Sequence, residues 1–175
     1  MHIIALILAV LGGAAFWWWR LKDVGAAASD AHDMAGRAWG KYKRVKFRRK
    51  VEDSPLEAVE DPVAAAVVLL FAMAKEGGEV TPSIEAAIRK EAEQTIKVDN
   101  PTELLVFGKW VAGHVVDVNN VILRYSKLWT GALEAEERRE LVGMVERIAM
   151  IAGVPVAKLQ PSLHKLNERL GLLAT

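Results

Sequence analysis

The chain has 175 residues, of which 52% are hydrophobic and 26% are charged, and this length predicts about one domain. It contains no cysteine, which excludes disulfides, thiolate metal sites and cysteine nucleophiles. The formal net charge of +1 divides unevenly, because residues 1–50 carry ten Lys/Arg and three Asp, whereas residues 51–175 carry 13 Lys/Arg and 19 Asp/Glu.

The first predicted element is a membrane anchor over residues 1–22. Residues 3–19 contain no charged side chain, and as a helix they extend for roughly 26 Å, near the lower limit for crossing a bilayer core. Three tryptophans and two cations close the stretch, as in an interfacial aromatic belt with a charged stop. They are Trp17, Trp18, Trp19, Arg20 and Lys22. A cleaved signal peptide is the main alternative, but it needs a basic leading region and a nearby small-residue cleavage site, and the sequence meets neither requirement well.

A basic juxtamembrane neck and linker is predicted over residues 23–60. Its cations alternate with aromatic and aliphatic residues, which favours binding to the anionic inner leaflet by about 1 kcal/mol per cation. The neck residues predicted at the membrane interface are Arg37, Trp39, Lys41, Lys43, Arg44, Lys46, Arg48, Arg49 and Lys50. Nucleic-acid binding uses the same residue types, and cations that only fix topology are a third interpretation. Closeness to the anchor favours lipid, so no nucleic-acid partner is predicted.

The same cations predict the orientation of the anchor. No Lys or Arg precedes the apolar stretch, whereas the basic neck follows it. Because basic residues accumulate on the cytoplasmic side of a membrane, we expect the N-terminus outside and the C-terminal body in the cytoplasm. In a bacterium this describes a single-pass protein of the inner membrane.

Residues 61–175 are predicted to form an all-α bundle of about six helices. Asp61, Thr81 and Asn100 each precede a proline, and this pair is typical of a helix N-cap followed by the first helical position. With the apolar spacing, these signals predict helices over residues 62–76, 82–97, 101–114, 117–129, 134–152 and 156–170. The short turns predict that neighbouring helices pack antiparallel around one core.

The bulky apolar residues are predicted to lie in the core, and the glycines are predicted to lie in turns. One apolar face of the first helix is expected through Val63, Val67, Leu70, Phe71 and Ala74. The large residues expected in the core are Phe71, Met73, Trp110, Trp129, Met144 and Met150. The glycines expected at turns or left-handed helix ends are Gly77, Gly78, Gly131, Gly153 and Gly171.

A weak internal repeat with a spacing of 53 residues pairs Gly78 with Gly131 and Val80 with Leu133. Both halves contain a helix, a glycine turn, an acidic helix start and a second helix. This pattern resembles the TerB-like family of tellurite-resistance proteins over about residues 61–171. An anchor followed by such a domain is also similar to the N-terminal part of DjlA-type co-chaperones. Their J-domain carries His-Pro-Asp, which this sequence lacks, so stimulation of a chaperone is not predicted.

The TerB-like resemblance implies a divalent-metal site at the two glycine turns. Members of the family commonly carry Ala-Asp-Gly there, but Gly77 and Thr130 stand at the two Asp positions of this chain. The acidic residues that remain as candidate oxygen ligands are Glu76, Glu79, Glu134, Glu136 and Glu137. Acidic residues in the first turn of a helix are also favoured by its dipole. We therefore expect a TerB-like fold without the metal site, with a divalent cation as the alternative.

No common signature of an enzyme occurs in the sequence. Nucleophile elbows, phosphate-binding loops, dinucleotide fingerprints and His-Glu-x-x-His are all absent. His114 and Asp117 could share a helical face, but Asp117 is also placed to cap the next helix. We predict a non-enzymatic interaction module, a scaffold or accessory subunit, that binds another membrane or membrane-associated protein. A divalent-metal-binding stress protein is the second hypothesis, and an enzyme of unknown type is the third.

Overall fold

The computed structural model describes residues 55–173, which form six α-helices after one short 3-10 helix and contain no strand. The elements are η1 (Pro55–Ala58), α4 (Pro62–Glu76), α5 (Pro82–Gln94), α6 (Thr102–Gly113), α7 (Val118–Ala132), α8 (Ala135–Ile151) and α9 (Val156–Arg169). The predicted all-α class and six helices are confirmed. The predicted anchor and residues 23–54 of the neck lie outside the described residues. Within residues 55–173, no helix has both the length and the apolar character needed to cross a bilayer.

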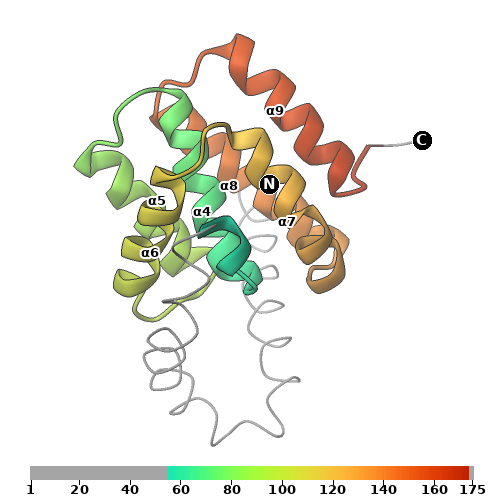
Figure 1. Cartoon of the computed structure of the whole chain (residues 1–175), viewed down its shortest axis with the longest axis horizontal. Helices are drawn as coiled ribbons and strands as arrows, with labels where there is room; N and C mark the ends of the chain where they lie inside the picture. Colours follow the sequence, from blue (N-terminus) through green and yellow to red (C-terminus); the bar gives the residue numbers. More distant parts are fainter. Residues whose placement is uncertain (1–54, 174–175) are drawn as a thin grey trace, which may run out of the picture.

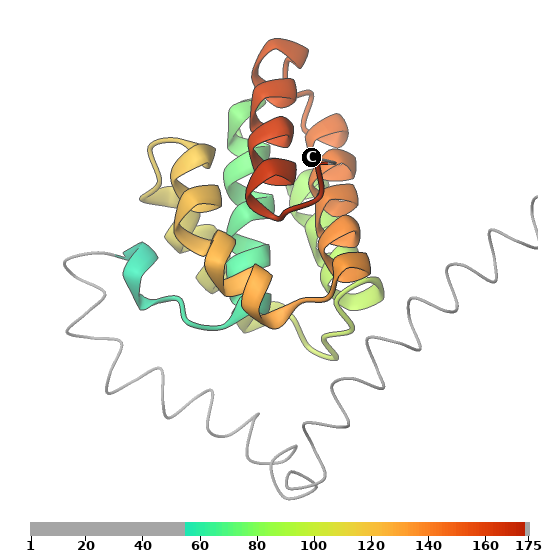
Figure 2. The same cartoon turned by 90° about the vertical axis from the view of Figure 1, so that its right-hand side faces the viewer.

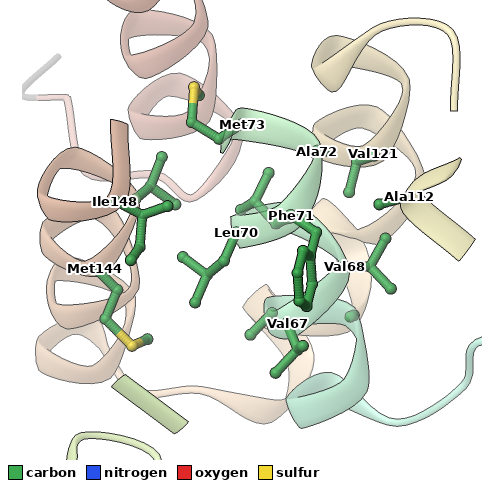
Figure 3. Packing of buried hydrophobic residues seen from close by; sticks show 14 of the residues in the cluster. Val67, Val68, Leu70, Phe71, Ala72, Met73, Ala112, Val121, Met144 and Ile148 are labelled. Carbon is green, nitrogen blue, oxygen red and sulfur yellow. The ribbon is translucent and has the colours of Figure 1, made fainter. Parts of the chain in front are cut away.

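Helix α4 lies in the middle of the bundle (Figure 1) and supplies much of its core. All its residues from Ala64 to Ala74 are buried. In Figure 3, Met144 and Ile148 of α8 lie on one side of α4, and Ala112 of α6 and Val121 of α7 lie on the other. The sequence predicted a single buried face, but α4 is apolar all round and its neighbours enclose it completely.

The direction of each helix follows from contacts with α4. Lys75 Nζ donates to the carbonyl oxygen of Ala112 at 2.7 Å, so α4 and α6 end on the same side and run in the same direction. Gly77 packs against Ala152 just beyond α8, so α8 also runs with α4. Helix α7 runs the opposite way, and Figure 2 shows α7 and α8 on either side of α4. Successive helices run in opposite directions as predicted, but the prediction that they pack on one another is wrong: α4 packs chiefly against α6, α7 and α8, and it is parallel to α6 and α8.

These directions define two ends of the bundle. The base is the end at which α4 begins at Pro62 and α7 ends at Ala132. The tip is the end at which α4 ends at Glu76 and α8 ends at Ile151, in the upper part of Figure 1.

Two of the three predicted N-caps are confirmed. Asp61 Oδ2 accepts a hydrogen bond from Ala64 N at 2.8 Å, and Thr81 Oγ1 accepts one from Ile84 N at 3.4 Å. Burial raises the pKa of the Asp61 carboxyl, and its backbone hydrogen bonds only partly oppose this effect. The prediction for Asn100 is wrong by one position, because α6 begins at Thr102 and its cap position is occupied by a proline.

The predicted glycine turns are confirmed at Gly77 and Gly78, directly after α4, and at Gly153 and Gly171, which have φ of 66° and 67°. The prediction for Gly131 is wrong, because this residue lies inside the last turn of α7. Its partner in the internal repeat, Gly78, has φ of 129° in the turn after α4. The repeat therefore pairs two glycines whose backbones differ.

The predicted core is correct at Phe71, Met73, Trp129 and Met144, all of which are fully buried. It is wrong at Trp110 and Met150, which retain 39% and 69% of their exposure. The inner positions of α6 are held by Gly108, Val111 and Ala112, which leaves Trp110 on the outer face. Met150 follows Ile148 and Ala149, which take the inward positions in the last turn of α8.

Two aromatic residues of α7 fasten the beginning of the bundle. The Tyr125 hydroxyl donates to the Leu56 carbonyl at 2.9 Å, and Trp129 Nε1 donates to the Pro62 carbonyl at 3.2 Å. Their rings meet edge to face with centroids 5.8 Å apart. Burial raises the pKa of the Tyr125 hydroxyl far above its usual value, so this group remains a donor. Part of the predicted linker, from residue 55 onward, therefore packs on the bundle.

An ion pair joins α5 to α8 across 56 positions of sequence. Arg147 donates to both carboxylate oxygens of Glu91, at 2.7 and 2.9 Å, and to Glu140 at 2.9 Å. Burial acts to raise the pKa of Glu91, but the hydrogen bonds from Arg147 and Thr95 outweigh it and lower this pKa below its usual value.

This ion pair should stabilise the fold only while Glu91 is ionised. In a double-mutant cycle with Glu91→Gln and Arg147→Gln, we expect a coupling free energy of about 1 kcal/mol at neutral pH. Because the folded-state pKa of Glu91 is lowered, the contribution is complete above its unfolded-state pKa of about 4.3 and is lost as the pH falls through the folded-state pKa. Urea unfolding of the four proteins between neutral pH and pH 3 measures the coupling, and a coupling that persists at the acid end contradicts this account.

Candidate interaction surfaces

The four glutamates favoured as metal ligands do not converge in the structure. Glu76 and Glu79 lie at the tip, around the end of α4, whereas Glu134 and Glu137 lie at the base, where α8 begins. The 17 residues of α8 separate the two pairs by about 26 Å. Between residues 55 and 173, no three or more His, Asp or Glu side chains are grouped so that they could hold a metal ion.

Four of the five candidate glutamates, all except Glu79, have structural contacts. Glu137 is buried, and its Oε2 accepts a hydrogen bond from the backbone nitrogen of Glu134 at 2.7 Å, as in a capping box at the start of α8. Glu76 forms an ion pair with Lys158 of α9 at 3.3 Å, which fastens the tip. Glu79 is exposed in the turn after α4, and Glu136 is paired with Arg139.

The His114/Asp117 pair also has a structural role. Asp117 Oδ1 accepts a hydrogen bond from the backbone nitrogen of Asn119 at 2.8 Å, which confirms it as the N-cap of α7. His114 Nδ1 lies 2.9 Å from the Trp110 carbonyl oxygen at the end of α6. These contacts account for both side chains without a ligand.

An aromatic stripe follows the outer face of α6. We define the α6 stripe as Val106, Phe107, Trp110 and His114, one or two helical turns apart. Val106 keeps 65% of its exposure, and the Trp110 ring lies 6.5 Å from that of Phe107 and 4.7 Å from that of His114. The stripe starts near the base and ends at the tip, because α6 runs with α4. Phe107 is partly buried against the core, so the exposed Val106 and Trp110 side chains are the ones suited to contact with a further chain.

A second apolar surface lies at the tip. We define the tip patch by four exposed residues, Val116, Met150, Ile151 and Val156. They come from the α6–α7 turn, the end of α8 and the start of α9, three segments that meet around the last turn of α4. Their exposed fractions are 94%, 69%, 54% and 69%, respectively, so half of the large exposed hydrophobic residues described for this bundle are at one end.

Sequence reasoning missed both surfaces. Spacing within one helix indicates which residues share a face, but it does not tell whether another helix covers that face. The one signal in the sequence is at the end of α8, where four apolar residues follow one another. The first two face inward, and Met150 and Ile151 come directly after them. A helix of this pattern cannot bury all of them against one neighbour.

The membrane-interface residues predicted between Trp17 and Lys50 lie outside the described residues. Comparison with known proteins gives no match to any family model, curated protein or solved structure. The resemblance to TerB-like and DjlA-type proteins therefore stays a prediction based on the repeat and the arrangement of helices.

Proposed function

We propose that this chain is a membrane-anchored, non-enzymatic interaction module whose helical bundle faces the cytoplasm and binds another membrane or membrane-associated protein. The observation that carries the proposal is the tip patch. Four large apolar side chains are exposed at that end of a bundle whose central helix is enclosed by its neighbours. A grouped apolar surface on a well-packed domain is typical of a site for protein association.

The partner of the tip patch is expected to be a protein rather than a lipid surface. The acidic residues Glu76, Glu79 and Asp117 lie at the same end. The two nearby lysines are engaged, since Lys75 donates to backbone carbonyls of the α6–α7 region and Lys158 pairs with Glu76. The three acidic and two basic side chains leave this end without a net positive charge that would attract an anionic leaflet, whereas a protein partner can place apolar groups on the patch and donors at its rim.

If the chain is anchored in the membrane, a weak contact at the tip patch would be sufficient to hold the partner. The uncharged stretch at residues 3–19 supports insertion into the membrane, and the cations of the neck support a cytoplasmic body. A tethered domain and a membrane-bound partner meet at an effective concentration far above that of two free proteins. The role that follows is localisation, as a scaffold or an accessory subunit of a membrane complex.

The experiment compares two matched variants of the full-length, affinity-tagged chain. Met150→Gln/Val156→Gln removes two exposed side chains from the tip patch, and Val106→Gln/Leu123→Gln removes two from α6 and α7. After detergent extraction, mass spectrometry identifies the proteins that co-purify with each. Because an anchor residue in an interface contributes more than about 1 kcal/mol, we expect the tip variant to lose its partner at least about tenfold and the control to retain it.

Two results would contradict this proposal. Equal recovery of every co-purifying membrane protein by both variants would exclude the tip patch as the binding surface. Extraction of the chain without detergent would exclude the anchor. Thermal unfolding of both variants verifies that neither substitution has altered the bundle itself.

A further inference from the structure

Charge is unevenly distributed over the bundle. Residues 55–173 contain 17 Asp/Glu and 13 Lys/Arg, a net charge of −4. Helices α7 and α9 together carry five of these cations and a single acidic residue, Glu168. The two helices pack against each other and lie side by side in Figure 2. An acidic bundle therefore has one surface of the opposite sign.

Four of the five cations have no acidic partner. We define the basic face by Arg124 and Lys127 of α7 and by Lys165 and Arg169 of α9. Among residues 55–173, none of the four takes part in an ion pair or a side-chain hydrogen bond, whereas most other cations of the bundle do. Their charges are therefore available to an anionic ligand.

Each helix presents its two cations on one face. Arg124 and Lys127 are three positions apart, and both are exposed on the outer side of α7. Lys165 and Arg169 are four positions apart on α9, the first half-buried and the second exposed. Residues with these spacings are neighbours on a helix surface. The basic face is thus made of two pairs on two adjacent helices.

The two pairs also lie at a similar height along the bundle. Helix α9 begins at the tip, where Lys158 pairs with Glu76. It ends near the base, where Arg138 of α8 donates to the Leu170 carbonyl. Helix α7 runs the same way, from the turn that accepts hydrogen bonds from Lys75 to the start of α8. The cations occupy the middle or the second half of both helices, so the two pairs form one patch.

We propose that the basic face binds an anionic membrane surface and thereby fixes the orientation of the bundle. Each Lys or Arg near an anionic leaflet strengthens binding by about fivefold, so four acting together support a stable contact. Leu123, which directly precedes Arg124, keeps 43% of its exposure and provides an apolar side chain for the headgroup region. The proposal rests on the membrane anchoring of the proposed function, because a tethered bundle meets the leaflet at a high effective concentration.

Two features of α7 favour a membrane as the anionic ligand. The Tyr125 hydroxyl holds Leu56 against α7, so the chain enters the bundle beside Arg124. An anchor that precedes Pro55 would therefore bring this side of the bundle to the membrane first. The aromatic rings of Tyr125 and Trp129 are buried, so they cannot stack on bases as a single-stranded nucleic acid requires.

This contact would set the direction of the tip patch. Helices α7 and α9 both run from the tip to the base, so they lie along the membrane when the basic face is bound to it. The end of the bundle then points parallel to the leaflet. The tip patch would face neighbouring membrane proteins instead of the cytoplasm, which deepens the proposed function.

Because the chain contains no cysteine, single labelled cysteines report on the contact. We would place the full-length protein in nanodiscs with a fluorophore on Asn120→Cys of α7 or on Ala86→Cys of α5, and measure quenching by nitroxide-labelled headgroups. Both positions are exposed, and α5 lies across the bundle from α7 in Figure 1. With about 30% phosphatidylserine, we expect quenching at Asn120 to be at least about fivefold stronger than at Ala86, and in pure phosphatidylcholine we expect weak quenching at both.

Two charge variants with the α7 label test the basic face itself. Lys127→Gln/Arg169→Gln removes two of its cations, and Lys90→Gln/Lys97→Gln removes two from α5 and the turn after it for the same change in net charge. We expect the ratio of quenched to unquenched label to fall at least about tenfold in the first variant and by less than about twofold in the second. Thermal unfolding verifies that neither variant has altered the bundle.

Each alternative result has a distinct meaning. Equal quenching of the two labels, or quenching that does not depend on phosphatidylserine, would refute the basic face as a lipid-binding surface. Equal losses in the two charge variants would show that net charge alone attracts the bundle. A label that responds to an RNA oligonucleotide but not to phosphatidylserine would reassign the face to nucleic acid.

Failure of this proposal and failure of the proposed function can be told apart. No partner protein is present in these measurements, so a negative result leaves the tip patch untouched. A chain that does not enter nanodiscs would contradict the anchor of the proposed function. The same labels, with the chain added to phosphatidylserine vesicles, would then test the basic face alone.

Discussion

Replacing Trp129 with alanine is expected to lower the free energy of unfolding by about 3–5 kcal/mol, the range for removing a fully buried tryptophan. The indole is completely buried between α7 and the start of α4 and packs edge to face against Tyr125. Its Nε1 also satisfies the carbonyl of Pro62, which loses this donor in the variant. Urea unfolding of the protein, followed by circular dichroism at a helical wavelength, measures the change.

Two smaller substitutions separate packing from hydrogen bonding at this position. Trp129→Phe keeps most of the ring volume and loses the donor, and Tyr125→Phe removes the hydroxyl that donates to Leu56. Each is expected to cost about 1–2 kcal/mol, well below the alanine variant. A loss of less than about 1 kcal/mol for Trp129→Ala would show that the ring does not belong to the cooperative core.

Gly77→Ala is expected to destabilise the bundle by about 2–3 kcal/mol because it introduces a steric overlap at the tip. A β-carbon on Gly77 would overlap the carbonyl oxygen of Ala152 and lie 2.9 Å from its carbonyl carbon and 3.2 Å from Val154 N. All three are backbone atoms, so no side-chain rotation relieves the contact. With φ of −84°, the glycine is not needed for a left-handed backbone. Close packing of the α4 end on α8 alone requires it.

Gly131→Ala provides the matched control for this prediction. Gly131 lies in the last turn of α7, and a β-carbon there would have no atom within 4 Å. Alanine favours a helix over glycine by about 0.5–1 kcal/mol, so this variant should melt at a higher temperature than the parent. If both alanine variants shifted the melting temperature in the same direction, the steric account of Gly77 would be wrong.

The local signals in the sequence were sufficient to predict where the helices lie along the chain. They were insufficient to predict how the helices pack on one another. Aspartate or threonine before proline gave correct starts for α4 and α5, because an N-cap is formed by residues adjacent in sequence. The end of α5 was placed about three residues too late, since the chain turns at Lys97 with φ of 65°. Helix α4 was assigned one apolar face, although a helix this rich in alanine and valine packs on every side.

The candidate surfaces were less predictable than the fold. The acidic residues at the two turns suggested a metal site, but only the packing shows that α8 separates them and that Glu137 caps the helix. Trp110 is large and apolar, as core residues usually are. Its exposure depends on which side of α6 meets Val67 and Phe71. The pairing of Glu91 with Arg147 likewise depends on two helices that are distant in sequence. Such contacts have no local signal.

The hydrogen bonds of Tyr125 and Trp129 also determine how the bundle would respond to mechanical force. A pull on the chain before Pro55 passes first through η1, where Tyr125 holds Leu56, and then to Pro62, where Trp129 holds the start of α4. These two aromatic residues transfer the tension to α7 before it reaches the innermost helix. Tension applied before Pro55 would therefore load α7 and the start of α4 before it reached the tip of the bundle.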